Sequence, residues 1–448
     1  MLNVLMFFST FLGGAIMTFA STPVFAFALY QAVYFFYPQN RWWGGMVPDL
    51  AYSFYTVVLM ALALLTCFKD AQQNKLLAAP QMRWLFLIMI LFVTTSFYAV
   101  FPIFHDDAMV NFIKLAIIMS IAYKLIIGDR ELNIALWGYI FGSWYISFVA
   151  FQIGRNAGDR VEGIGAVDSP DANGTAASIA PALVLAFYYF WVTKNKLAKA
   201  ALAIAGVFIA NAIVLINSRG AFLGVAISMI YFIYHMYFSR FQRKNQKVTV
   251  IALVVCGLIG ASVIVDKSFI DRMGTINKEK VSEDQESGAT RTAFWMAAWD
   301  MAKDHPMGVG VAGFQYYAPV YINENVNTGE SRNRAVHSTW FEALSELGYP
   351  GFIALIGMIL SSFMTMSKAR KVLRERNQID EYFKVRAIEG ALLAFIITMT
   401  FLNRLRADVL YWCVLYSACA YNIYVIKQYE SRSVNTYEEI EKKKKISR

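Results

Sequence analysis

The chain has 448 residues, of which 58% are hydrophobic, and a formal net charge of +10. Long apolar runs recur along almost its whole length, which argues against a soluble enzyme of several globular domains and is typical of a polytopic membrane protein. The positive charge does not indicate a nucleic-acid partner, because the Lys and Arg residues gather in short connections between the apolar runs.

The first apolar stretch covers residues 4–36 and is interrupted near Pro23. We interpret it as a single broken crossing of the membrane, with a hairpin that crosses twice as the alternative. The cationic start and small-residue cleavage site of a signal peptide are lacking, so we expect the stretch to be retained as a membrane span.

Further spans are predicted wherever about 20 apolar residues follow one another, since this length crosses a bilayer as a helix. They lie at residues 50–67, 84–103, 109–127, 132–153, 175–193, 200–216, 220–238, 248–265, 340–367, 387–402 and 409–426. The sequence thus predicts an all-α polytopic membrane protein with about twelve transmembrane helices. These spans are almost free of charge, with Lys114 as an exception.

Basic clusters in the connections predict which loops face the cytoplasm. The clusters are Lys69–Arg83, Lys194–Lys199, Arg240–Lys247, Lys368–Arg376 and Lys442–Lys445. The opposite side then receives the loops 154–174, 217–219 and 403–408 and one long polar loop. We therefore expect four segments: transmembrane helices at 1–265, an external loop with short helices at 266–338, transmembrane helices at 339–426, and a basic cytoplasmic tail at 427–448.

Two helix starts are predicted in and after the long loop. Thr290 can cap a helix over Arg291–Asp304, which His305 and Pro306 would end. Phe294, Trp295, Trp299 and Met301 suggest a face of this helix that lies on lipid headgroups. Farther along, Thr339 and Glu342 have the spacing of a capping box, which favours a structural role for Glu342.

Arginines stand out in the loops expected outside. Arg155 and Arg160 lie in one outer loop, Arg219 in a turn too short to hold its charge far from the bilayer, and Arg291 at the start of the loop helix. The forked donors of guanidinium groups suit diphosphate oxygens. His337, just before the next span, can serve as a proton acceptor. We predict that these side chains converge on one external cavity for a polyprenyl diphosphate.

The sequence offers no convincing set of divalent-metal ligands. His105 with the two following aspartates is more typical of a polar hairpin than of a metal site. We therefore expect the arginines to neutralise the phosphate charge that Mg²⁺ neutralises in many other enzymes.

At these positions the chain resembles the O-antigen ligase and polymerase superfamily of bacterial envelope glycosyltransferases, over about residues 154–352. The shared blocks are Gly158–Gly163 with Pro170–Asn173, then Asn217–Gly220, then Arg291–Trp299 with His305–Gly310 and Phe314, and finally His337–Ser338 with Glu346–Gly348 and Gly351. One departure is Pro170-Asp171-Ala172-Asn173, where the family often has Pro-Asn.

The resemblance implies an inverting, metal-independent transfer of a glycan from undecaprenyl diphosphate, without a cofactor, at the periplasmic face of the bacterial inner membrane. By position, His337 would be the general base, and Arg219 and Arg291 would hold the diphosphate with help from Arg160. The partners would be the lipid-linked donor, membrane lipids and an acceptor, with no nucleic acid.

The acceptor distinguishes the activities that remain open. It is lipid A-core in the ligases and a second lipid-linked glycan in the polymerases. The long Trp-bearing loop, able to lie beside a lipid-borne acceptor, slightly favours the ligase. A lipid-linked glycan flippase or transporter is the alternative from a different class, and the scarcity of charge within the spans argues against it.

Overall fold

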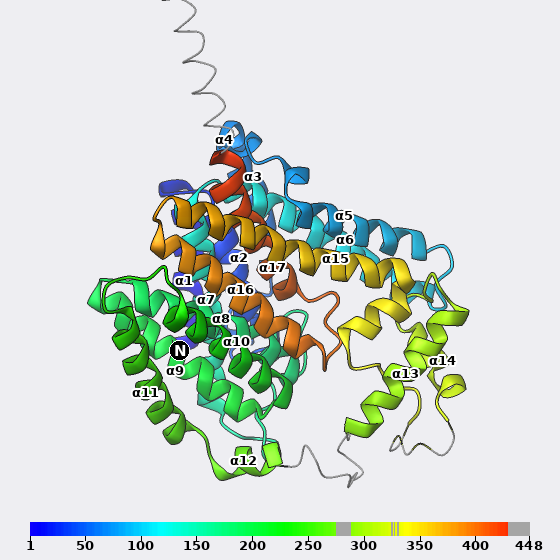
Figure 1. The fold of residues 1–448 in the computed structure, drawn as a ribbon. Coiled ribbons are helices and arrows are strands. Elements are labelled where there is room, and N and C mark those ends of the chain that lie inside the picture. Colours follow the sequence, from blue (N-terminus) through cyan, green and yellow to red (C-terminus); the bar gives the residue numbers. More distant parts are fainter. Residues whose placement is uncertain (275–287, 324–325, 327, 329–330, 429–448) are drawn as a thin grey trace, which may run out of the picture.

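The computed structural model describes residues 1–274, 288–323, 326, 328 and 331–428. These residues form a bundle of helices with a smaller helical unit, α13 and α14, beside the beginning of α15 (Figure 1). The described residues contain no β-strand, only two isolated bridges. The predicted all-α class is therefore confirmed.

The helices follow one another in the order expected from the apolar runs. In chain order they are α1 (Leu2–Ala20), α2 (Phe25–Phe36), α3 (Tyr52–Thr66), α4 (Phe68–Gln72), α5 (Pro80–Thr95), α6 (Pro102–Leu125), α7 (Asp129–Ile153), α8 (Ala172–Val192), α9 (Lys196–Ile216), α10 (Arg219–Phe238), α11 (Gln246–Ile264), α12 (Lys267–Gly274), α13 (Gly288–Asp304), α14 (Gly313–Tyr321), α15 (Thr339–Glu375), α16 (Ile379–Met399) and α17 (Asp408–Tyr421).

Nine helices in the described part of the chain are long and apolar enough to cross a membrane: α1, α6 to α11, α15, and α17 with its π-helical extension to Ile426. Residues Tyr52–Ala78, bent by 92°, would form a tenth span. The apolar α5 is shorter, and α16 carries charges that the predicted span at 387–402 left out. The chain is thus a multi-pass membrane protein.

The first two helices do not form the predicted single crossing. The ring centroids of Phe7 and Phe36 lie 5.7 Å apart, and a methyl group at Gly14 would lie 3.0 Å from Leu29. The contacts pair the beginning of α1 with the end of α2 and a later part of α1 with an earlier part of α2, so the two helices are antiparallel. Residues 4–36 therefore form an antiparallel helix pair and not the predicted single broken span, and of the two helices only α1 is long enough to cross a membrane.

Contacts with α7 show how far the hairpin reaches. Asn3 donates a hydrogen bond to Gln152 at the end of α7, whereas Arg130 at its start donates one to Ser21 (3.1 and 3.0 Å). The first helix thus runs the length of α7. The second helix has only 12 residues, which is shorter than the bilayer requires, and this explains why the apolar pattern did not reveal it as a separate element.

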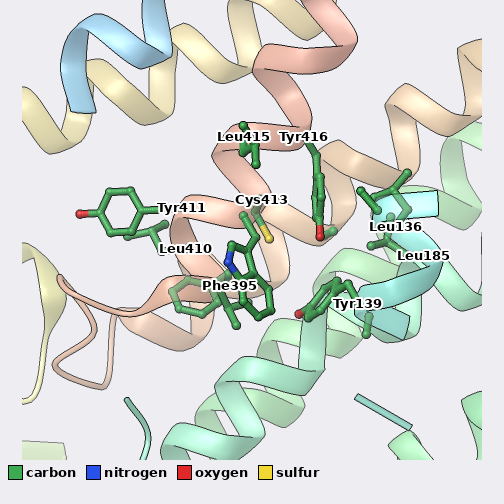
Figure 2. Packing of buried hydrophobic residues seen from close by; sticks show 14 of the residues in the cluster. Leu136, Tyr139, Leu185, Phe395, Leu410, Tyr411, Cys413, Leu415 and Tyr416 are labelled. Atoms are coloured by element: carbon green, nitrogen blue, oxygen red, sulfur yellow. The ribbon is translucent and has the colours of Figure 1, made fainter. Parts of the chain in front are cut away.

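The most buried of the nine candidate spans is α17. In Figure 2, its Tyr416 lies beside Tyr139 of α7, with 6.3 Å between the ring centroids. Trp412 also packs on Tyr139, at 5.6 Å. At the other extreme, only 6% of the most apolar 18-residue stretch of α11 is buried. A helix of this kind presents most of its surface to lipid, because apolar side chains need no protein cover inside a bilayer.

The basic connections lie together at one end of the bundle, which we call the basic end. Arg243, between α10 and α11, forms an ion pair with Asp380 in the first turn of α16 and packs on the ring of Trp191 at the end of α8. Lys427 donates a hydrogen bond to the carbonyl oxygen of Ile127 (2.6 Å). The grouping fits the positive-inside pattern, whereas the assignment of this end to the cytoplasm stays a prediction. The predicted basic tail at Lys442–Lys445 lies outside the described residues.

The helix α16 is longer than the predicted span at 387–402, and most of its charged residues precede that span. Lys384 pairs with Asp129 (2.6 Å) and Arg386 with Glu389 (3.1 Å). Arg370 of α15 pairs with the same Glu389. Lys384, Arg386 and Glu389 lie in the first half of α16, near the basic end. Each has an opposite charge beside it, which offsets the cost of removing it from water.

The helices α13 and α14 share a small hydrophobic core of their own. Phe294 and Met301 are buried in it against Phe314 and Val336, so these two side chains do not form the predicted headgroup-facing surface. Trp299 is 40% exposed. The helix also begins at Gly288, so Thr290 lies inside it and does not flank it as predicted.

This small unit is anchored in a break of α15. Gly348 has a left-handed backbone (φ +69°), which interrupts the helix. The backbone amides of Val309 and Gly310 donate to the carbonyl oxygens of Ser345 and Glu346 (3.0 and 2.9 Å). The chain after α13 thereby occupies the break. Two of the motif blocks found in the sequence, Glu346–Gly348 and His305–Gly310, are thus the two sides of one backbone joint.

Candidate functional site

Arg160 is fixed between two helix ends opposite to the basic end. Its Nη2 donates to the side-chain oxygen of Asn173 at the start of α8 (2.6 Å), and its Nε donates to the carbonyl oxygen of Ile216 at the end of α9 (3.2 Å). The amide of Val161 also donates to the carbonyl of Leu215. The asparagine of the Pro170–Asn173 block therefore orients an arginine.

Arg219 opens α10 directly after the left-handed Asn217, which ends α9. Its guanidinium is partly buried and is repelled by the charges of Arg160 and Arg291. Within the described part of the chain, Arg219 has neither a hydrogen bond nor an ion pair. Three like charges within electrostatic range of one another favour the approach of an anion.

The turn that contains His337 is held against the first turns of α13. Trp295, one helical turn after Arg291, donates its indole N–H to the carbonyl oxygen of Val336 (3.2 Å) and stacks on Phe341. His337 follows Val336 and has a left-handed backbone (φ +50°). A residue other than glycine adopts this conformation at a cost in energy, and such residues concentrate at functional sites.

The ring of Phe401 connects the two groups. It lies 6.3 Å from the ring of Trp295, and a methyl group at Gly220 would lie 3.4 Å from its Cδ2. The start of α10 and the middle of α13 thus meet across one aromatic side chain. Arg160, Arg219 and Arg291 are brought into electrostatic range of one another, and His337 lies beside the same aromatic cluster.

Arg155, the remaining outer arginine, has another role. It forms an ion pair with Asp266 at the end of α11, with 3.0 Å from Nη2 to Oδ1. The hydrogen bond from Arg155 lowers the pKa of Asp266, and the same bond raises the pKa of Arg155. This arginine therefore ties two loops together instead of joining the other three.

The 403–408 turn supports His337 in a way that sequence reasoning missed. The amide of Ser338 donates to the side chain of Asn403 (3.1 Å). Thr339 donates to the carbonyl of Leu402 (2.7 Å) and accepts from the amide of Arg404 (2.9 Å). Its hydroxyl is thereby used, and the predicted capping box does not form. Glu342 has the predicted structural role by a different route, since it accepts from the amide of Leu405 (3.0 Å).

Two buried or partly buried arginines in the same turn complete this support. Arg404 donates to the carbonyl of Asp168, to the hydroxyl of Ser169 and to the carboxylate of Asp171 (2.9, 3.0 and 3.1 Å). Arg406 pairs with Glu342 and Glu346. Like Arg219, both arginines lie in a short loop that is expected to face outward. Their hydrogen bonds and ion pairs, however, show that they stabilise the turn.

The described residues contain no group of three or more His, Cys, Asp or Glu side chains placed to hold a metal ion. His105, considered as a ligand in the sequence, is buried. It bonds to the carbonyl of Phe92 (2.8 Å) and accepts from the amide of Val311 (3.2 Å). It therefore joins α5 to the chain before α14.

Comparison with known proteins adds one finding to this geometry. Residues 204–356 match the family model described as O-antigen ligase. This range includes Arg219, Arg291 and His337 and excludes Arg160 and the 403–408 turn. The match confirms the resemblance to the O-antigen ligase and polymerase superfamily. No curated protein matches the chain.

Proposed function

We propose that this protein is a membrane glycosyltransferase that moves a glycan from undecaprenyl diphosphate to an acceptor hydroxyl, with its site on the periplasmic side of the bacterial inner membrane. The observation that carries the proposal is the group of Arg160, Arg219 and Arg291 near His337, in a chain that matches the O-antigen ligase family. A lipid diphosphate fits this group because its charges would replace the repulsion between the arginines with attraction.

The arginines differ in how they would act on the donor. Arg160 is already oriented by Asn173 and Ile216, so it is suited to positioning. Arg219 has no partner among the described residues and is suited to direct contact with the diphosphate. The diphosphate is a good leaving group, and charge stabilisation with correct positioning would supply most of the rate acceleration.

His337 would act as the general base. The acceptor oxygen attacks the anomeric carbon, its O–H proton passes to the imidazole, and the bond between that carbon and the diphosphate oxygen breaks. The electron pair leaves with undecaprenyl diphosphate, and a single displacement inverts the configuration. The proton on His337 is released to solvent before the next cycle. Base catalysis of this type contributes about 10²–10⁴-fold.

The test uses the purified chain reconstituted with a lipid-linked glycan and lipid A-core. We expect His337→Ala to lower turnover by about 10²–10⁴-fold, while His305→Ala, a second histidine of the same unit, stays near the wild type. We expect Arg219→Gln to weaken capture of the donor, with the exposed Lys267→Gln as its control. Near wild-type turnover of His337→Ala would refute the base assignment.

The same assay separates the alternatives. Transfer of one glycan to lipid A-core identifies a ligase, which we favour because α13 and α14 form a separate outer unit beside His337. A ladder of elongated lipid-linked products without lipid A-core identifies a polymerase. Translocation of the donor with its glycosidic bond intact identifies a flippase.

A further inference from the structure

A second charged cavity lies at the basic end, at the opposite end of α10 from Arg219. Its volume is about 640 Å³, and it opens between the last turn of α10, the end of α15 and the second turn of α16. Its lining includes Tyr234, Phe238, Arg240, Arg374, Tyr382 and Arg386. The proposed glycosyl transfer uses none of these residues.

Guanidinium groups outnumber carboxylates around this cavity. The carboxylate of Glu389 forms ion pairs with Arg386 of α16 and with Arg370 of α15, which lies one turn before Arg374. Arg374 donates to the phenol oxygen of Tyr382 (3.1 Å), a neutral partner. Arg240 has no hydrogen bond or ion pair within the described residues. The cavity therefore keeps an excess of positive charge after its internal pairs are counted.

Helix capping does not account for this charge. Basic side chains often bind the free carbonyl groups at the end of a helix. At the end of α10 two of these carbonyls already have side-chain partners, because Gln242 donates to Met236 and Tyr237 (2.7 Å each) and Gln246 donates to Met236 (2.8 Å). The side chain of Arg240 is thus available to an external group.

The outer wall of the cavity is aromatic and exposed. Tyr234 and Phe238 are 55% and 63% exposed, and their ring centroids lie 4.8 Å apart on the last turn of α10. Aromatic residues at the end of a membrane helix are typical of the headgroup layer. The charged cavity therefore opens where lipid headgroups would lie and not toward bulk water alone.

We propose that this cavity binds the phosphate of an anionic membrane phospholipid, with phosphatidylglycerol as the representative. Guanidinium forks match phosphate oxygens, and basic pockets between membrane helices are recurrent sites for anionic headgroups. Arg240 and Arg374 contact the phosphate from the open side, Arg386 supplies charge from the inner wall, and the acyl chains lie along Tyr234 and Phe238. This site is independent of the proposed glycosyl transfer.

The test is native mass spectrometry of the purified full chain, equilibrated with equal amounts of phosphatidylglycerol and phosphatidylcholine. We expect the wild type to retain phosphatidylglycerol selectively. The double variant Arg240→Gln and Arg374→Gln should lose at least about tenfold in apparent affinity, since each substitution removes a charged hydrogen bond. The control is Lys194→Gln with Lys196→Gln, which removes two exposed charges from the same end and should retain the lipid as the wild type does.

Equal retention of phosphatidylglycerol by the two double variants would overturn the proposal, as would equal retention of both lipids by the wild type. A further arm adds inorganic phosphate to lipid-free protein in detergent and follows the melting temperature. If phosphate stabilises the protein as strongly as phosphatidylglycerol at the same concentration, the cavity binds a soluble anion and the lipid assignment fails.

Discussion

The joint between α15 and the chain after α13 can be tested by replacing Gly348 with alanine. Its backbone (φ +69°, ψ −166°) lies in a region used essentially by glycine alone, and any other residue there costs about 1–3 kcal/mol. A methyl group there would also lie 2.2 Å from the carbonyl oxygen of Pro306, closer than any ordinary contact. To make room, the segment 306–310 must move away from α15.

The size of the loss follows from the bonds across this joint. The amides of Val309, Gly310 and Tyr349 donate to Ser345, Glu346 and Pro306, at 3.0, 2.9 and 2.9 Å. A hydrogen bond of this type contributes about 1 kcal/mol. We therefore expect Gly348→Ala to lower the free energy of unfolding by about 1–3 kcal/mol if the bonds survive, and by about 4–6 kcal/mol if all three break.

Thermal unfolding of the purified protein in detergent measures this loss, and Gly13→Ala is the matched control. Gly13 lies inside α1 with no atom within 4 Å of an added methyl group. Alanine at such a site should stabilise the helix by about 0.5–1 kcal/mol. Glycosyl transfer should fall with Gly348→Ala, because the joint holds α13 and thereby Arg291. A Gly348→Ala protein that unfolds at the wild-type temperature would refute this account of the joint.

Other substitutions address the charges around the site. Arg404→Gln should destabilise the protein by about 3 kcal/mol, since three hydrogen bonds of a buried cation are lost. Arg155→Gln should cost less, about 1 kcal/mol, because its ion pair is partly exposed to solvent; equal melting temperatures would contradict this ranking. Asn173→Ala should raise the KM for the donor more than it lowers kcat, because it releases Arg160 while leaving His337 in place; an unchanged KM would argue against positioning. The lowered pKa of Asp266 means that its pair with Arg155 stabilises the protein above the ordinary aspartate pKa, and that the contribution is lost only as the pH falls through the lowered value. The stability difference between wild type and Asp266→Asn should therefore be constant near neutral pH and disappear only below about pH 3.9; a difference already lost at pH 6 would exclude this pair as its source.

Hydrophobic runs and basic clusters predicted the helical class and most helix positions, because both depend on composition over about 20 residues. The antiparallel arrangement of α1 and α2 was not predicted, because α2 is shorter than the stretch of about 20 apolar residues by which spans were identified. The charged first turns of α16, residues 379–386, were left out of the predicted span because their ionic partners Asp129 and Arg243 lie in distant parts of the sequence and cannot be inferred locally.

The site itself was only partly accessible from sequence. Outward arginines and the family blocks indicated Arg160, Arg219, Arg291 and His337, whose catalytic roles stay predictions. The bracing turn was not found, because Arg404 meets partners near residue 170 and Asn403 meets Ser338, at separations where no periodicity operates. Thr339 and Glu342 had the spacing of a local cap, yet both bind that distant turn instead.

The gathered groups come from both halves of the polypeptide. Arg160 and Arg219 precede the end of α12 at Gly274, whereas Arg291, His337 and Asn403 follow the start of α13 at Gly288. A gene divided between these two points would therefore yield two inactive products. Activity should return only when both products are inserted in the same bilayer and associate. The architecture therefore predicts fragment complementation between the two halves of the chain.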